Sequence, residues 1–233
     1  MRILAFESSA KAASVAVLQD GILLGEYYQN SGQTHSRTLM QMANNLLENC
    51  DLSVRDIDSV AVASGPGSFT GIRIGVSAAK GFAWGRELPV YGVSTLEAMA
   101  ALHASFEGVI CASMDARRSQ VYNALFRCHE GEIERITEDR AISLEELADE
   151  LKNLQDKKIL IGDGALLCYN TMKGQVNLLC LAQEAFRMQR ASGVALLAAG
   201  RIARGDPGDS LSLAPNYLRL SQAEREKLSR EGK

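Results

Sequence analysis

The chain has 233 residues, 46% of them hydrophobic and 23% charged, with a net charge of −3. This composition is typical of a soluble globular protein with one large or two small domains, and the charge does not indicate a nucleic-acid-binding protein. Five scattered cysteines without a C-x-x-C pair, no apolar run of the ~20 residues a membrane span needs, and a start that enters a strand directly predict a cytoplasmic protein without a membrane partner or signal peptide.

The first half of the sequence alternates between strand-like and helix-like runs. Its predicted strands are 2–9, 13–21, 22–29, 59–64 and 89–94, and its predicted helices are 34–50, 71–86 and 95–106. Apolar residues in 34–50 recur at helical spacing, which indicates an amphipathic helix. The order β-β-β-α-β-α-β-α predicts a first domain over residues 1–106.

The second half repeats the order of strands, helix, strand and helix. It is predicted to comprise two strands within 108–128, an edge strand and loop in 129–143, a helix at 143–155, a strand at 157–165 and a helix at 191–206. Ser143 precedes Glu146 by three residues, the spacing of a capping box. The repeated order suggests a duplicated α/β fold. We predict a second domain over 107–233, with its tail packing back on the first.

A glycine-rich loop, GPGSFTGIRIG (65–75), separates the predicted strand 59–64 from the following helix. It has no P-loop lysine, and Thr70 stands where a dinucleotide-binding loop needs its third glycine. Two interpretations remain: simple turn chemistry, or an anion site formed by backbone N–H groups at the helix start. The loop residues assigned to either role are Gly65, Gly67, Gly71 and Arg73.

Metal and hydrolase motifs are incomplete. HEGEI (129–133) has Ile133 in place of the second histidine of a zinc-protease motif, and His35 is followed one turn later by Leu39 rather than by a second ligand. No G-x-S-x-G elbow occurs. The sequence therefore predicts no metal site, no cofactor and no serine hydrolase.

Small residues dominate the predicted helix 71–86. Gly71, Gly75, Ala79 and Ala83 follow one another at four-residue spacing. Glycine in a helix costs ~1 kcal/mol relative to alanine, so this row needs a reason such as the close approach of another backbone. Two interpretations stay open: the row meets a partner protein, or the helix is buried within this chain.

Four segments together closely resemble the TsaB (YeaZ) family, which works in the bacterial synthesis of threonylcarbamoyladenosine in tRNA. These segments are ILAFESSAKAASVAVL (3–18), THSRTLM (34–40), GPGSFTGIR (65–73) and MDARRSQVY (114–122). The similarity covers most of the first 125 residues in order. Beyond residue 130 it is looser, with GDGA (162–165) and APNYLR (214–219) as its fixed points.

The resemblance implies an actin-like ATPase (ASKHA) fold of two ribonuclease-H-like domains, and a non-catalytic role. TsaB-like proteins pair with the catalytic subunit TsaD through helices of the first domain, and the pair works with the ATPase TsaE. We therefore expect a homodimer when the chain is alone and only indirect contact with tRNA. The predicted interface residues are Leu39, Met42, Ala43, Leu46, Gly75, Ala79 and Ala83.

The rival hypothesis is an autonomous actin-like metabolite kinase. Actin-like ATPases carry an acidic residue near the first hairpin turn, where Glu7 stands here, and a kinase also needs a catalytic aspartate, for which Asp115 is the candidate. The segment 114–120 holds two arginines and no glycine, which does not fit a second phosphate loop. The tail 219–233 is interpreted as a solvated helix end.

Overall fold

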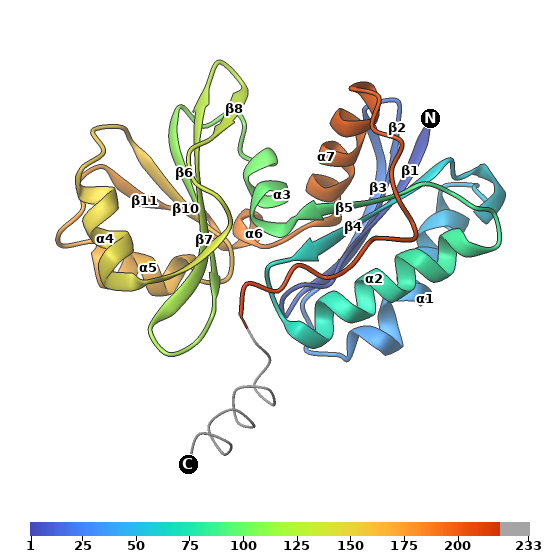
Figure 1. Cartoon of the computed structure of the whole chain (residues 1–233), viewed down its shortest axis with the longest axis horizontal. Helices are drawn as coiled ribbons and strands as arrows, with labels where there is room; N and C mark the ends of the chain where they lie inside the picture. The colour runs from blue at the N-terminus through green and yellow to red at the C-terminus, as the bar shows by residue number, and fades with distance from the viewer. Residues whose placement is uncertain (220–233) are drawn as a thin grey trace, which may run out of the picture.

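The computed structural model describes residues 1–219 and contains two β-sheets that lie side by side, each with its own helices (Figure 1). The first sheet has the order β3-β2-β1-β4-β5. Its strands are β1 (Arg2–Glu7), β2 (Ala13–Gln19), β3 (Ile22–Gln29), β4 (Ser59–Gly65) and β5 (Val90–Ser94). Strands β2 and β3 are antiparallel to their neighbours, whereas β1, β4 and β5 are mutually parallel.

The second sheet has the order β11-β10-β6-β7-β8, with β9 also pairing with β7. Its strands are β6 (Gly108–Asp115), β7 (Gln120–His129), β8 (Glu132–Arg135), β9 (Arg140–Ser143), β10 (Lys158–Ile161) and β11 (Leu179–Leu181). Both sheets therefore open with an antiparallel hairpin whose first strand then pairs in parallel with a later strand. The repeated topology is what the repeated element order suggested.

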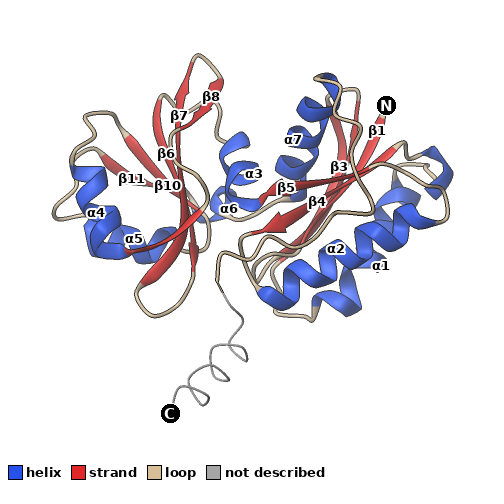
Figure 2. Ribbon diagram, in the orientation of Figure 1, coloured by secondary structure: helices blue, strands red, loops and turns tan. Residues whose placement is uncertain are grey.

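Helices cover both faces of the first sheet (Figure 2). The helices α1 (His35–Asn49) and α2 (Phe69–Trp84) lie on one face, and α7 (Ala191–Ala203) lies on the other. Side chains alternate along β1 accordingly: Leu4 and Phe6 belong to the core under α1 and α2, while Ile3 belongs to the core under α7. Burial on both faces explains why the strand reads as a continuous apolar run.

The second sheet is also covered on both faces. The helices α4 (Leu144–Lys152) and α5 (Ala165–Met172) form one core with it, and α3 (Thr95–Ala101) fills the space between the sheets. A four-residue helix, α6 (Glu184–Arg187), precedes the return of the chain to the first sheet through α7. Residues 191–219 therefore lie against the first half, although they come after the second in sequence.

Some element boundaries differ from the sequence prediction. Helix α2 begins at Phe69, two residues earlier than predicted, because the Ser68 hydroxyl caps it by accepting the Gly71 N–H at 3.3 Å. The capping box of Ser143 and Glu146 is confirmed. The elements α5, β11 and α6 were not predicted, and the predicted tail helix falls largely on residues outside the described part of the chain.

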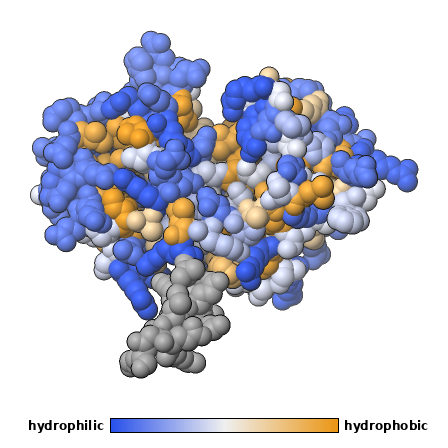
Figure 3. Space-filling model, viewed as in Figure 1, coloured by the Kyte–Doolittle hydropathy of each residue, from blue (hydrophilic) through white to orange (hydrophobic). Residues whose placement is uncertain are grey.

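Hydrophilic residues cover most of the visible surface, with smaller apolar patches between them (Figure 3). No helix within residues 1–219 has both the length and the apolar character that crossing a bilayer requires.

Candidate functional site

The glycine-rich loop after β4 lies directly on the turn between β1 and β2. The Ser68 N–H donates to the Ser9 carbonyl oxygen at 2.6 Å. A Cβ atom at Gly67 would lie less than 3.0 Å from that oxygen, and one at Gly71 less than 3.0 Å from the Ser8 carbonyl oxygen. These glycines therefore permit a backbone approach that no larger residue allows. The simple-turn interpretation accounts for them without a ligand.

Part of the hydrogen-bonding capacity at the start of α2 is already used within the chain. The Ser68 N–H is bonded to Ser9, and the Gly71 N–H is bonded to the Ser68 hydroxyl. The anion-site interpretation relies on such N–H groups. Two of them are satisfied within the chain, which weakens that interpretation.

The seven predicted interface residues belong to the internal core of the first half. All of them are buried, and they are Leu39, Met42, Ala43, Leu46, Gly75, Ala79 and Ala83. They face the first sheet, because the apolar stripe of an amphipathic helix packs on its own core. As a correction to the predicted interface, these side chains stabilise the fold of this chain, and a partner on the same helices would contact their opposite face.

The small-residue row of α2 has an internal purpose as well. A Cβ atom at Gly75 would lie 2.6 Å from the Ser8 hydroxyl, and that hydroxyl donates to the Gly71 carbonyl oxygen at 2.9 Å. The backbone that approaches α2 is thus the turn after β1. Of the two interpretations of this row, burial within the chain is the one the structure supports.

A C-terminal segment, residues 206–219, runs from α7 along the first half to the space between the halves (Figure 1). We call it the strap. The Asn216 N–H donates to the Ser64 carbonyl oxygen at 2.7 Å. The Tyr217 ring stacks on Phe69 with centroids 4.4 Å apart, and its hydroxyl accepts the Arg73 Nε–H at 2.7 Å. Of the four loop residues, Arg73 is therefore the one that fixes the strap on α2.

The strap also reaches the second half. The Arg219 guanidinium donates to the Ala116 carbonyl oxygen, in the turn between β6 and β7, at 2.8 Å. The segment APNYLR (214–219) thus connects the glycine-rich loop of the first half to the β6–β7 turn of the second half. Such a long-range contact is not visible in a sequence, because Ala116 and Arg219 are 103 positions apart.

These segments enclose a cleft of about 700 Å³ between the halves. Basic side chains from separate parts of the sequence line it together with two carboxylates; they are Lys11, Arg117, Arg118, Arg219, Asp115 and Asp163. Sequence reasoning considered Arg117 and Arg118 only as obstacles to a phosphate loop, and it missed Lys11 and Arg219. Both residues lie in segments that resemble the family, Lys11 in ESSAK (7–11) and Arg219 in APNYLR (214–219), and this was the signal that could have identified them.

Two acidic groups near the cleft are perturbed by burial. The Glu7 side chain is fully buried, and desolvation raises the pKa of its carboxyl to about 7 although it accepts the Ser9 N–H at 2.6 Å. Burial also raises the pKa of Asp163, which accepts a hydrogen bond from Gln189 Nε2 at 2.8 Å and feels the negative charge of Asp115. Both groups are therefore more easily protonated than ordinary carboxyls.

Asp115, the candidate catalytic aspartate of the kinase hypothesis, is exposed at the edge of the cleft. Its Oδ1 accepts the Arg117 N–H at 2.7 Å, so it helps to shape the turn after β6. His35 lies at the start of α1, with Nε2 2.8 Å from the Ala10 carbonyl oxygen, and Leu39 is buried in the core. His35 therefore tethers α1 to the β1–β2 turn.

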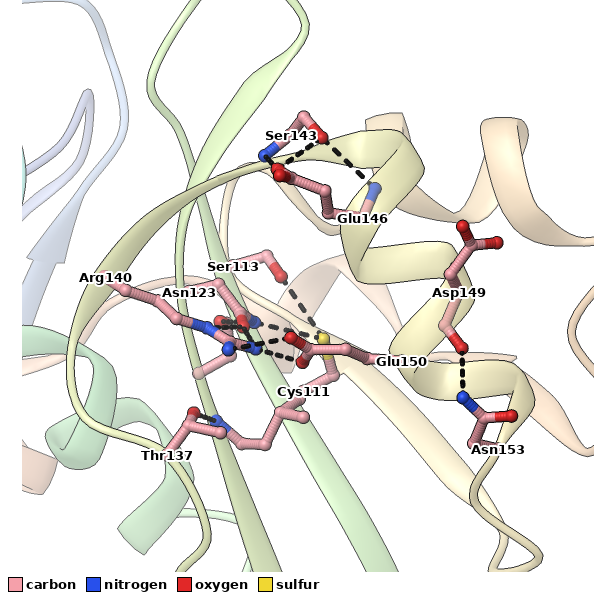
Figure 4. Close-up of polar contacts among 12 residues, drawn as sticks. Cys111, Ser113, Asn123, Thr137, Arg140, Ser143, Glu146, Asp149, Glu150 and Asn153 are labelled. Atoms are coloured by element: carbon pink, nitrogen blue, oxygen red, sulfur yellow. Dashed lines mark hydrogen bonds and ion pairs between the residues drawn. The ribbon is translucent and has the colours of Figure 1, made fainter.

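A network of polar side chains lies within the second half (Figure 4), and Arg140, Asn123, Glu150 and Cys111 of this network do not line the cleft. The Arg140 guanidinium bridges the Glu150 carboxylate and the side-chain Oδ1 of Asn123, and Asn123 Nδ2 donates to the Ala112 carbonyl oxygen at 3.0 Å. The Asn123 amide also lies 3.4 Å from Cys111 Sγ. Burial raises the pKa of the Cys111 thiol to about 11, which leaves it protonated and unreactive. This network ties α4 to the sheet.

Comparisons with known proteins identify related sequences. A family model described as "TsaD: tRNA N6-adenosine threonylcarbamoyltransferase" matches residues 29–226. The tRNA threonylcarbamoyladenosine biosynthesis protein TsaB of Bacillus subtilis is 33% identical over 225 residues, which cover 96% of this chain and 96% of that protein. TsaB of Escherichia coli is 35% identical over 167 residues, covering 70% and 72% of the two chains.

Solved structures identify the fold. The structure of YeaZ from Pseudomonas aeruginosa is similar with a TM-score of 0.79 and 26% identity, covering 93% of this chain and 99% of that one. The ROK hexokinase from Thermus thermophilus is similar with a TM-score of 0.50 at 12% identity, covering 87% and 100%, and this shows the fold alone. The predicted actin-like ATPase fold, with two mixed α/β sheets, is confirmed.

Proposed function

The chain belongs to the TsaB (YeaZ) family of tRNA threonylcarbamoyladenosine biosynthesis proteins, and on this premise we propose that it is a non-catalytic subunit that pairs with a TsaD-like catalytic subunit. The pair adds threonylcarbamoyl to an adenosine next to the tRNA anticodon. A model of the catalytic transferase matches most of this chain, so the proposed partner shares its fold. This relationship supports a pairing of two like-folded subunits.

We place the partner on the outer face of α1 and α2, opposite the buried face that the sequence predicted. On α2 this face presents Ser77, Gly81 and Trp84, and on α1 it presents Met40 and Asn44, all of them exposed. A Cβ atom at Gly81 would have no neighbour within 4 Å. A partner helix can therefore approach the α2 backbone closely at this glycine.

The observation that carries the proposal is the exposure of Trp84. It is the sole tryptophan of the chain, it ends α2, and its side chain is 80% exposed. Large aromatic side chains are seldom left in water on a monomer and are enriched at the centres of protein interfaces. Burying Trp84 under a partner would remove this exposed apolar surface.

The non-catalytic role is supported by the chemistry of the described residues. Within residues 1–219 no three His, Cys, Asp or Glu side chains are grouped so as to hold a metal ion. Asp115 is committed to its own turn, and Lys80 donates to the Leu211 carbonyl oxygen of the strap at 3.2 Å. The isolated chain should therefore show no ATPase or peptidase turnover. Robust turnover that Asp115→Ala abolishes would favour the kinase hypothesis.

The remaining partners rest on the same premise. A TsaE-like ATPase would act through the complex rather than on this chain alone. In the absence of the catalytic subunit, the outer face of α1 and α2 would be covered by a second copy of the chain. The homodimer and the heterodimer would then compete for one surface in the cytoplasm.

Co-elution with a TsaD-like transferase tests the pairing. We expect Trp84→Arg and Gly81→Arg to leave the circular dichroism spectrum and melting temperature unchanged, while each weakens association about a hundredfold or more, because each places a charge in the contact. The matched control is Leu166→Arg, on the exposed side of α5, which should bind as wild type. Folded variants that keep full affinity would place the interface elsewhere.

A further inference from the structure

Basic side chains converge at the mouth of the cleft from distant positions in the sequence. Lys11 comes from the β1–β2 turn, Arg117 and Arg118 from the β6–β7 turn, and Arg219 from the end of the strap. Lys11, Arg117 and Arg118 are exposed. Within residues 1–219 none of these three side chains takes part in an ion pair. Their charges are therefore available to a ligand.

The β6–β7 turn holds its arginines in an uncommon backbone conformation. Arg117, Arg118 and Ser119 all have left-handed φ values, of 62°, 56° and 56°. Residues other than glycine adopt this region rarely, and it persists where surrounding contacts enforce it. The Gln120 N–H donates to the Arg117 carbonyl oxygen at 3.2 Å, and the Leu144 N–H donates to the Ser119 carbonyl oxygen at 3.2 Å. The turn is thus held in a defined backbone shape, and both of its arginines line the cleft.

The charge balance of the cleft favours an anion. Two carboxylates line it against the four cations. Asp115 Oδ1 is engaged by the Arg117 N–H, and Asp163 is half-buried and bonded to Gln189. The Ser9 hydroxyl, buried at the cleft wall, has no partner in the described part of the chain and adds a neutral donor.

We propose that the mouth of this cleft binds phosphate groups of an RNA backbone, with Arg117 and Arg118 as the principal contacts. The identity of the RNA, a tRNA, rests on the proposed function. Guanidinium groups bind phosphate oxygens through paired charge-assisted hydrogen bonds. The family resemblance implied only indirect tRNA contact. The fold gathers basic residues that are scattered in the sequence, so the subunit touches the tRNA directly.

The test compares Arg117→Ala/Arg118→Ala with a control of equal charge, Arg55→Ala/Arg204→Ala, whose exposed arginines lie outside the cleft. Fluorescence anisotropy measures the affinity for tRNA at several salt concentrations. The full chain alone is measured over a low-salt series, and the chain bound to a TsaD-like partner is measured in the same way. Loss of two phosphate contacts should weaken binding about tenfold and reduce the slope of log affinity against log salt by about 2. The control should keep the wild-type slope.

Three outcomes overturn the proposal. The first is no measurable binding of tRNA by the wild type, and the second is the same slope and affinity for the two double variants. In the third outcome, Arg117→Ala/Arg118→Ala weakens the binding of free nucleotide but not of tRNA. Calorimetry with ATP and magnesium identifies the last case, in which the phosphate site serves a small nucleotide. Circular dichroism confirms that both variants are folded. If the wild type fails to bind the transferase, the proposed pairing fails, while the measurement on the chain alone still decides this inference.

Discussion

Each half of the molecule holds the start of a helix through one backbone hydrogen bond, to the β1–β2 turn in the first half and to strand β6 in the second. In the first half the Ser68 N–H after β4 donates to the Ser9 carbonyl oxygen at 2.6 Å; in the second half the Gly164 N–H after β10 donates to the Ser113 carbonyl oxygen at 3.0 Å. A Cβ atom at Gly71 or Gly162 would lie less than 3.0 Å from the facing carbonyl oxygen. Each half thus requires a glycine at a close backbone approach, Gly71 in the first turn of α2 and Gly162 directly after β10.

The halves differ in the turn that succeeds their first strand. Strand β1 ends in Glu7, which is 1% exposed, whereas β6 ends in Asp115, which is exposed. In the first half Ser8, Ser9 and Ala10 of the turn are buried beside α2 and the glycine loop, and Lys11 alone of residues 8–12 is exposed. In the second half the turn projects into the cleft and carries Arg117 and Arg118. A shared topology therefore fixes the backbone contact, while the burial of each turn decides whether its side chains can meet a ligand.

The largest expected effect comes from the covered side of α2. Ala79 is fully buried beneath this helix, so Ala79→Arg should destabilise the protein by about 4 kcal/mol or more, because it buries an unpaired charge. Urea unfolding measures the loss. Gly81→Arg, two residues along on the exposed side, should leave stability within about 0.5 kcal/mol of wild type. Equal losses in both variants would mean that α2 is enclosed on all sides.

Glu7 and Asp115 should differ in their effect on pH-dependent stability. The pKa of Glu7 is about 7 in the folded chain against 4.5 as a free group, so the folded state holds the extra proton between these values. Stability should therefore fall by about 3 kcal/mol as the pH rises from 4.5 through 7. Glu7→Gln should flatten this decline and raise stability at pH 8, measured by urea unfolding.

Asp115→Asn is the matched control at the end of β6. Asp115→Asn leaves the buried Glu7 carboxyl in place, so this variant should keep the decline that Glu7 causes. If Glu7→Gln retained the full decline, the buried carboxyl would not be its source. A wild-type stability that rose between pH 5 and pH 8 would contradict a raised pKa of Glu7 as the dominant effect.

The glycine contacts should be comparable in the two halves. Gly71→Ala and Gly162→Ala should each cost about 2 kcal/mol, since the new methyl group forces the facing carbonyl away. Gly162 also has φ of +95°, so its variant should lose at least as much as Gly71→Ala. Gly81→Ala, with open space around it, should instead gain about 1 kcal/mol. Thermal unfolding measures the stability of the three variants. If Gly71→Ala were as stable as the wild type, the β1–β2 turn would be able to move away from the new methyl group.

The smallest effect concerns the polar network of the second half. Arg140→Leu removes the donor to the side-chain Oδ1 of the buried Asn123 and should cost about 1.5 kcal/mol. Lys152→Ala, which breaks an exposed ion pair with Asp149, should cost less than about 0.5 kcal/mol. Equal values from chemical unfolding would indicate that water replaces Arg140 without loss.

Local patterns in the chain were enough to predict the order of most elements and the family. Apolar strands buried on both faces read as continuous runs, and the Ser143–Glu146 capping box marked the start of α4. The short elements α5, β11 and α6 escaped prediction because each is too brief for a clear period. The spacing in α1 and α2 correctly identified apolar faces, but nothing local says whether such a face meets its own sheet or another protein.

Only the tertiary structure decides what covers the apolar faces of α1 and α2 and which residues line the cleft. The Gly71 backbone is pressed against Ser8, 63 positions earlier, and Tyr217 stacks on Phe69 from the far end of the described chain. Lys11, Arg117 and Arg219 become neighbours only when both hairpin turns and the strap are in place. Sequence patterns report periodicity and turns over a few residues, whereas these contacts depend on how the two sheets and α7 pack together.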